Sequence, residues 1–298
     1  MPGGGAEDGC RSRAQEHPGH GRPAARRGTG PAVTRPPQRI GVPWPLSAAG
    51  VLLVGYLLAP FLFGVASLDT RELTLGLRAP ASVGAIETSL ATSTLSTLLV
   101  VVLGVPLAYL LARGQFAGKA VLGALVYLPL VIPPLVGGVL LLAMYGPYAP
   151  VGRWLGDHGV AITDAWPGIV LAQTFVSAPY LVVAARVAFE AVDPALEQVS
   201  YALGKPPLET FFRVSLPLAW PGILTGVPLA WLRALGEFGA TVMVAYHPYT
   251  LPVYLFVRFG AQGVRAALPV AVVLLAAGVA VLCLVQGAAR RGAGRVVP

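Results

Sequence analysis

Six apolar stretches of about 20 residues each dominate this sequence. They lie at approximately 46–66, 88–112, 120–145, 167–189, 215–235 and 267–288. The hydrocarbon core of a bilayer is about 30 Å thick and an α-helix rises about 1.5 Å per residue, so each stretch is long enough to cross it once. A soluble protein needs a charged surface, but only 11% of the 298 residues are charged. We therefore expect an all-α integral membrane protein with six transmembrane helices.

Residues 1–45 differ in composition from the rest of the chain. They are rich in Gly, Pro, Arg and Ser, and they hold too little apolar material to offset the entropy of ordering. A cleaved secretory signal would carry a short apolar stretch near its start, which this segment lacks. We expect a disordered cytoplasmic arm at 1–45, a transmembrane domain at 46–290 and a cytoplasmic tail at 291–298.

Basic residues at the ends of the apolar stretches predict the orientation in the membrane. If the N-terminus is cytoplasmic, the inner segments carry 14 lysines and arginines and the outer segments carry five. An excess of basic residues marks the cytoplasmic side. We expect both termini to lie in the cytoplasm of a bacterial cytoplasmic (inner) membrane. We therefore expect membrane lipid to be the partner of these basic residues. Their spacing does not predict a nucleic acid partner.

Eight prolines interrupt the apolar stretches, where each removes a backbone hydrogen-bond donor. They are Pro60, Pro106, Pro129, Pro133, Pro134, Pro179, Pro221 and Pro228. We expect helices that bend within a bundle. Hydroxyl side chains crowd 88–97, and we expect most of them to bond back to their own helix, although some could line a polar path.

The sequence offers no pattern for chemistry on a substrate. The two cysteines and four histidines are dispersed, so we expect no metal and no cofactor. The phosphate-binding pattern Gly-x4-Gly-Lys-Ser/Thr is absent, as are paired aspartates or a serine with a histidine inside the apolar stretches. We expect no enzyme activity in this chain, which leaves a carrier, a channel or a membrane subunit of a larger transporter.

The segment from about 190 to 217 predicts a short helix outside the membrane. Asp193 followed by Pro194 is a strong helix start, and Gly204 ends the pattern. Apolar residues recur at helical spacing between them: Leu196, Val199 and Leu203. Such a face could dock into a partner's groove or lie on the membrane surface.

The end of this segment resembles a known family signature. Gly204, nine further residues and then Val214-x-Leu216-Pro217 resemble the cytoplasmic loop of ABC importer permeases. That signature begins with Glu-Ala-Ala, whereas this chain has Gln198-Val-Ser200 there and Glu197 one place earlier. The resemblance implies a six-helix permease bundle whose coupling helix docks on an ABC ATP-binding subunit. It also implies which residues serve coupling: Glu197, Gln198, Ser200, Gly204, Leu216 and Pro217.

A second match narrows the class. The stretch Arg233-Ala-Leu-Gly-Glu-Phe-Gly-Ala-Thr241 is similar to one in molybdate and sulfate type permeases. Further matches lie at 104–113, 128–134 and 172–175, so the resemblance covers roughly 88–285. It implies the permease subunit of an ATP-driven importer for a tetrahedral oxyanion, molybdate or tungstate first, with sulfate or thiosulfate as the alternative. ATP would be hydrolysed by the ATP-binding subunit, and an extracytoplasmic substrate-binding protein would deliver the anion. A second permease copy would complete a dimer, and two identical chains are favoured over two related ones.

A carboxylate within a membrane helix is costly to bury, so it is a candidate functional residue. Glu237 lies four residues after Arg233, on the same helix face. The two could form a charge pair beside the translocation path, or a buried pair that fixes helix register. We group them with four neighbours as candidates for the path or the register: Gly236, Gly239, Thr241 and Gln173.

Overall fold

The computed structural model describes residues 43–293, and every regular element in that range is a helix. In chain order these are α1 (Trp44–Ala66), α2 (Thr70–Arg78), α3 (Pro80–Arg113), α4 (Lys119–Val131), α5 (Pro134–Tyr145), α6 (Pro150–Asp157), α7 (Trp166–Glu190), α8 (Pro194–Ala202), α9 (Pro207–Thr210), the π-helical turn η1 (Phe211–Ser215), α10 (Leu216–Leu235), α11 (Gly239–Val244), α12 (Leu251–Gln262) and α13 (Val264–Ala293). The predicted arm at 1–45 lies almost wholly outside the described residues, as does most of the predicted tail. The chain divides at Val54, within α1, into two parts, and the remaining helices belong to the second part.

Five helices among the described residues are long and apolar enough to cross a membrane, and a bent pair brings the count to six if it is one span. The fifth of the predicted stretches lies in a longer run, Pro207–Leu235, which includes the π-helical turn. The second stretch extends to 34 residues in α3. The all-α membrane fold expected from the sequence is thus confirmed.

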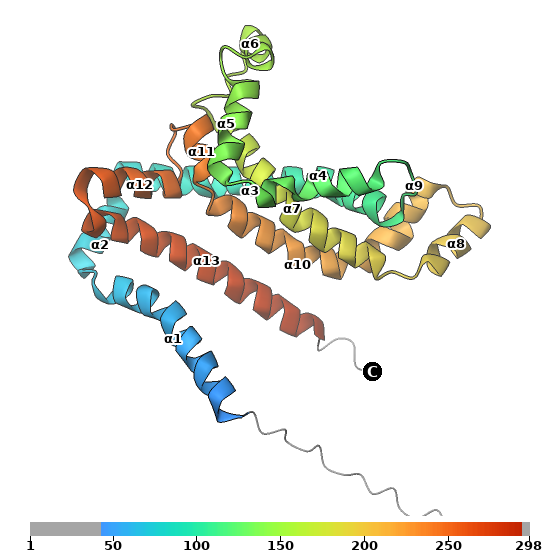
Figure 1. Ribbon diagram of the computed structural model, residues 1–298, viewed down its shortest axis with the longest axis horizontal. Coiled ribbons are helices and arrows are strands. Elements are labelled where there is room, and N and C mark those ends of the chain that lie inside the picture. The colour runs from blue at the N-terminus through green and yellow to red at the C-terminus, as the bar shows by residue number, and fades with distance from the viewer. Residues whose placement is uncertain (1–42, 294–298) are drawn as a thin grey trace, which may run out of the picture. The chain divides into compact units, whose positions relative to one another are not determined.

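The third predicted stretch, 120–145, is bent, as its prolines led us to expect. It breaks into α4 and α5, which meet at 113° (Figure 1). Ile132 and Pro133 between them are both extended, with ψ values of 141° and 135°. Each is followed by a proline, and the proline ring disfavours the helical conformation in the residue before it. Two consecutive prolines therefore turn the chain at this point.

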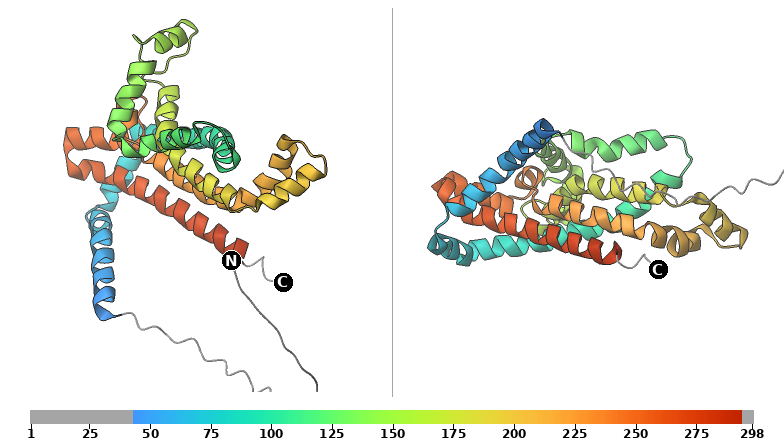
Figure 2. Two further views of the ribbon diagram at one scale, coloured as in Figure 1. Left: turned by 45° about the vertical axis from the view of Figure 1, so that its right-hand side comes forward. Right: turned by 90° about the horizontal axis from the view of Figure 1, so that it is seen from below.

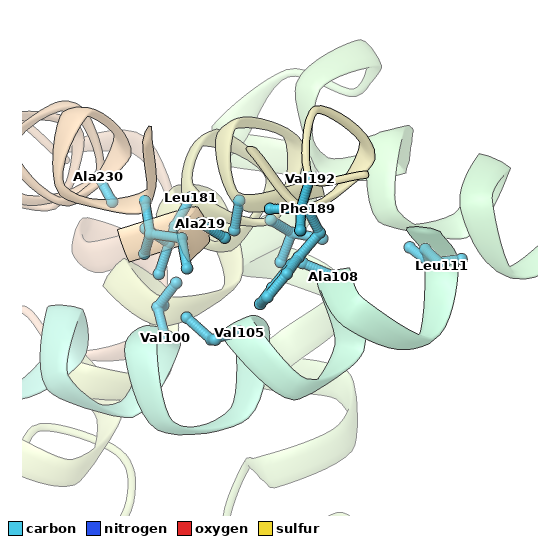
Figure 3. Close-up of a cluster of buried hydrophobic side chains, with 12 residues drawn as sticks. Val100, Val105, Ala108, Leu111, Leu181, Phe189, Val192, Ala219 and Ala230 are labelled. Carbon is cyan, nitrogen blue, oxygen red and sulfur yellow. The ribbon is translucent and has the colours of Figure 1, made fainter. Parts of the chain in front are cut away.

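The centre of the bundle consists of α3, α7 and α10. Their buried side chains form one apolar cluster, in which Val100, Val105 and Ala108 of α3 lie near Leu181 and Phe189 of α7 (Figure 3). α10 contributes Ala219, Ile223 and Ala230 to the same cluster. Small residues at this contact allow the helices to approach closely, which is how membrane helices gain packing energy without a hydrophobic driving force.

α7 and α10 run antiparallel through a contact of small residues. A Cβ at Gly222 would lie 2.6 Å from Ala188 Cβ, and a Cβ at Gly226 would lie 2.7 Å from Ala184 Cβ. A contact under 3 Å leaves no room for a larger residue at either glycine. These two pairs fix the register of the helices, because each step of four residues along α10 matches four residues back along α7.

The hydroxyl groups of α3 are mostly satisfied within the helix, as expected. The side chains of Thr92, Ser96 and Thr97 each donate to the carbonyl four residues earlier, at 2.7 Å. Ser89 instead accepts a hydrogen bond from the Leu251 N–H at 2.6 Å, which ties the start of α12 to α3. Ser96 reaches across to α7, where Gln173 Oε1 accepts at 3.1 Å.

Candidate coupling and translocation sites

The short helix predicted in the 190–217 segment is α8. The Asp193 side chain accepts a hydrogen bond from the Ala195 N–H at 2.9 Å, and Pro194 takes the first helical position, so the predicted helix start is confirmed. Gly204 follows the helix with φ +79°, the left-handed conformation that glycine adopts without strain. α8 and α9 lie beyond the ends of α7 and α10, at one end of the bundle (Figure 2).

Glu197 holds α8 against the bundle. Its side chain is buried, and both carboxylate oxygens accept from Arg113 Nε at 3.1 Å. Ser215 Oγ donates to Oε1 at 2.8 Å, and Arg113 Nη2 donates to the Val192 carbonyl at 2.6 Å. The pair therefore joins the end of α3, the start of the loop, α8 and the π-helical turn at a single point.

A second polar contact fixes the other end of α8. Ser200 and Thr210 are buried, and their hydroxyl oxygens lie 2.8 Å apart. The sequence places Glu197 and Ser200 among the coupling residues, and both lie inside the loop, where they set its shape. Gln198 is exposed, as are Gly204 and Pro217, and Leu216 is half-buried.

The outer face of α8 is apolar. Leu196, Val199 and Leu203 are 47%, 58% and 75% exposed, respectively. Together with Val214 and Leu218 they line a groove of about 460 Å³ between α8 and the start of α10. Three charged residues stand at its edge, where Glu209 pairs with Lys205 at 2.8 Å and with Arg213 at 3.1 Å.

The Arg233–Glu237 pair predicted from the sequence is present. The two side chains are 2.5 Å apart at the end of α10, and Glu237 is 1% exposed. Glu237 Oε1 also accepts from the Ala240 N–H at 2.7 Å, so the carboxylate caps the start of α11. One carboxylate thus neutralises Arg233 and sets where α11 begins.

α11 lies tightly against α5. A Cβ at Gly138 of α5 would lie 2.8 Å from the Ala240 Cα, and a Cβ at Gly239 would lie 2.9 Å from the Leu135 backbone nitrogen. Only glycine fits at either position without displacing the facing backbone. α11 therefore connects two features: Glu237 of the ion pair caps its start, and its residues pack against α5, which follows the break after α4. Gly236, between α10 and α11, is exposed.

Several buried polar atoms have no hydrogen-bond partner among the described residues. They are Gln173 Nε2, Thr174 Oγ1, Ser177 Oγ, Thr241 Oγ1 and Thr250 Oγ1. Three of these residues lie on α7, and Thr241 follows Ala240, which packs against Ala172 and Val176 of that helix. An unpaired buried donor costs about 1–3 kcal/mol, so such a group calls for a ligand, a water or another conformation.

Sequence reasoning did not identify Arg113 and Ser215 as part of the coupling segment. Arg113 lies 84 residues before its partner Glu197, and in the sequence it stands only as a charge at the end of a span. Ser215 in the signature position before Leu216-Pro217 carried no signal of its own. In the part of the chain that the structure describes, no group of three His, Cys, Asp or Glu residues could hold a metal ion.

Comparison with known proteins identifies the family. The family model described as "Binding-protein-dependent transport system inner membrane component" matches residues 101–291, which is more than half of the chain. The chain belongs to this family. The permease is 46% identical over 241 residues to a Haloferax volcanii protein named "Probable molybdenum ABC transporter permease protein", covering 81% of the permease and 88% of the relative. It is 38% identical to the molybdate/tungstate transport system permease protein WtpB of Pyrococcus abyssi, covering 77% and 88% of the two chains.

Solved structures share the fold of the permease. A chain of a bacterial ABC transporter that imports the polysaccharide alginate aligns with a TM-score of 0.67 at 19% identity, over 85% of the permease and 96% of that chain. A chain of the MetNI methionine ABC transporter in an inward-facing conformation aligns with a TM-score of 0.56 at 20% identity, over 78% and 100%. These structures show the fold, and the family match with the relatives above makes the permease a multi-pass ABC transporter membrane subunit.

Proposed function

We propose that the permease forms the translocation path of an ATP-driven importer for molybdate or tungstate. The names of the relatives from Haloferax volcanii and Pyrococcus abyssi support this anion class. In this proposal a separate subunit hydrolyses ATP, an extracytoplasmic binding protein delivers the anion, and two identical copies of the permease form the pore. A sulfate or thiosulfate permease is the alternative within the same class.

The observation that carries the proposal is the construction of α8. The nine-residue helix and its C-cap expose three apolar side chains, those of Leu196, Val199 and Leu203, while Glu197 and Ser200 anchor the other face in the bundle. An apolar face on a firmly held helix is what a groove on a partner protein recognises. Because the anchor ties α8 to α3 and to η1, which leads into α10, a movement of α8 is transmitted to two membrane helices. We propose that docking of the ATP-binding subunit on this face drives the transition between inward and outward openings.

The orientation follows from the same feature. If α8 contacts an ATPase in the cytoplasm, then the ends of α3 and α7 are cytoplasmic. The basic residues agree, since Arg113 and Lys119 flank the connection between α3 and α4, which lies on the same side of the membrane as α8. Both termini are then cytoplasmic.

The path itself is proposed to pass the Arg233–Glu237 pair. The contacts of Gly222 with Ala188 and of Gly226 with Ala184 set the register of α10 on α7. Continued along α10, this register brings Arg233 to about the level of Ser177, and Glu237 follows two residues after the helix ends at Leu235.

In this proposal the pair and the unpartnered polar side chains of α7 line the path together as a polar layer within an apolar bundle. Neutral donors with one partly neutralised arginine would stabilise an oxyanion without holding it tightly.

The proposal is tested on the assembled transporter in proteoliposomes. We expect ATPase activity to rise when the binding protein carries molybdate or tungstate. The double substitution Val199→Ser with Leu203→Ser should abolish this rise, because both side chains are exposed and their removal leaves the bundle packing intact. Val160→Ser, at another exposed apolar residue, is the matched control and should leave the rise unchanged.

The outcomes separate the alternatives. Stimulation by sulfate alone would favour the sulfate permease. Solute movement by the permease without any ATPase would restore the carrier or channel interpretation. An unchanged response of the Val199→Ser, Leu203→Ser variant would show that α8 is not the docking face.

A further inference from the structure

Residues of α2, α12 and α13 line a recess of about 470 Å³. The turn between α12 and α13 lies beside α2, at the end of the bundle opposite α8 and α9 (Figure 1). The walls of the recess come from α2, from the end of α12 and from the first turns of α13. The lining residues are Gly76, Ala79, Arg258, Gln262, Arg265, Ala266 and Pro269. None of these residues belongs to the coupling segment or to the proposed translocation path.

The recess is positively charged. Among the described residues, neither Arg258 nor Arg265 forms an ion pair with a carboxylate. Arg258 Nε donates to the Ala266 carbonyl at 3.2 Å, which holds the turn between α12 and α13 and leaves its terminal nitrogens for other partners. The backbone N–H groups of the first turn of α13 have no partners within the helix, and they add partial positive charge.

The walls of the recess are firmly packed. A Cβ at Gly76 would lie 3.1 Å from Pro269 Cβ, so α2 closely approaches α13 there. Ser82 Oγ donates to the Gly76 carbonyl at 2.5 Å and lies 3.4 Å from the Tyr254 hydroxyl oxygen. Beneath these contacts Tyr254 and Val270 belong to a buried apolar cluster. The arginines therefore project from a preorganised frame.

Apolar side chains surround the arginines. Phe259 and Val264, the neighbours of Arg258 and Arg265, are 50% and 61% exposed, and Phe256 is 49% exposed. Arginines alternating with exposed apolar residues at the end of membrane helices are typical of the interface between headgroups and acyl chains.

We propose that this recess binds a tetrahedral oxyanion group through Arg258, Arg265 and Gln262. Guanidinium groups bind such oxygens with charge-assisted and often bidentate hydrogen bonds, and Gln262 adds a neutral donor. The group is either the phosphate of an anionic phospholipid, which the apolar surroundings favour, or a free oxyanion in solution. The proposal does not rest on the transport function, because it concerns only the affinity of this surface.

The test measures binding to the full-length permease. Native mass spectrometry of the purified chain with phosphatidylglycerol, and separately with phosphatidylcholine, gives the lipid affinities. Equilibrium dialysis with molybdate and with inorganic phosphate gives the affinity for free anions. Arg265→Gln removes a charge that makes no described contact within the fold. Arg258→Lys keeps the charge and removes the bidentate geometry. Arg153→Gln, at an exposed arginine of α6, is the control.

For a lipid site we expect Arg265→Gln to weaken phosphatidylglycerol binding at least tenfold, with Arg258→Lys intermediate and Arg153→Gln unchanged. Phosphatidylcholine binding should be equal in all variants. If instead only molybdate or phosphate binding falls in Arg265→Gln, the ligand is the free oxyanion. Equal affinities of the wild type and Arg265→Gln for all four probes would overturn the proposal.

Discussion

Replacing Glu197 by alanine should release α8 from α3 and η1, leaving its Ser200–Thr210 contact with α9, without unfolding the membrane domain. The substitution removes the acceptor of two hydrogen bonds from Arg113 Nε and one from Ser215. Arg113 keeps only its hydrogen bond to the Val192 carbonyl. The links from α8 to α3 and to η1 are thereby broken, whereas the apolar cluster of α3, α7 and α10 is untouched.

The magnitude follows from the burial of the pair. The side chains of Arg113 and Glu197 are 18% and 7% exposed, so the pair is largely removed from water. Breaking a buried pair by removing one partner costs about 3–5 kcal/mol. Because Arg113 keeps one partner and some access to solvent, we expect the lower end, about 3 kcal/mol. A factor of ten corresponds to about 1.4 kcal/mol, so the open form of the loop should become about 100-fold more populated.

Hydrogen exchange on the purified permease measures this change directly. The amides of α8 should exchange about 100-fold faster in Glu197→Ala, with exchange in α7 and α10 unchanged. Glu190→Ala is the control, because Glu190 forms an exposed pair with Arg186 one turn away in α7, and it should not alter α8. Unchanged protection of α8 in Glu197→Ala would refute the assignment of Glu197 as its anchor.

Three further substitutions test other parts of the structure. Gly204→Ala should lower the free energy of unfolding by about 1–2 kcal/mol, because Gly204 has φ +79°, even though no atom would block a Cβ there. Thermal unfolding measures this loss, and a variant as stable as the wild type would contradict the left-handed turn. Gly138→Ala should destabilise the protein by about 1–3 kcal/mol, because the new Cβ would clash with Ala240. Gly84→Ala is the control and should leave stability unchanged, since a Cβ there meets nothing within 4 Å. Equal melting temperatures of the two variants would argue against the close contact of α5 and α11. Glu237→Ala should destabilise the protein by about 3 kcal/mol, because Arg233 loses its partner. Oxyanion uptake should fall by more than the loss of folded protein explains. Normal uptake by a folded variant would show that the pair is not part of the translocation path.

The sequence predicted the features that depend on neighbouring residues. Hydropathy located the membrane helices, since a span needs a continuous apolar stretch. Asp193 and Gly204 marked both ends of α8, because capping and the left-handed turn are local. The spacing of Arg233 and Glu237 predicted their ion pair for the same reason.

The features that depend on distant contacts were not predictable in this way. The prolines at 133 and 134 indicated a bend, but the angle of 113° depends on how α5 packs against α11. α11 and α12, of six and 12 residues, are too short to register as spans. Glu197 was expected at the coupling surface, and only the fold brings Arg113 and Ser215 around it.

The most direct test of the central claim is uptake of molybdate into proteoliposomes that contain the permease, its ATP-binding subunit and its binding protein. We predict uptake only when ATP is supplied to the side that carries the ATP-binding subunit, with tungstate competing more strongly than sulfate. The Val199→Ser, Leu203→Ser variant should accumulate no molybdate. Equal uptake without ATP, or by the permease alone, would contradict the proposed importer function.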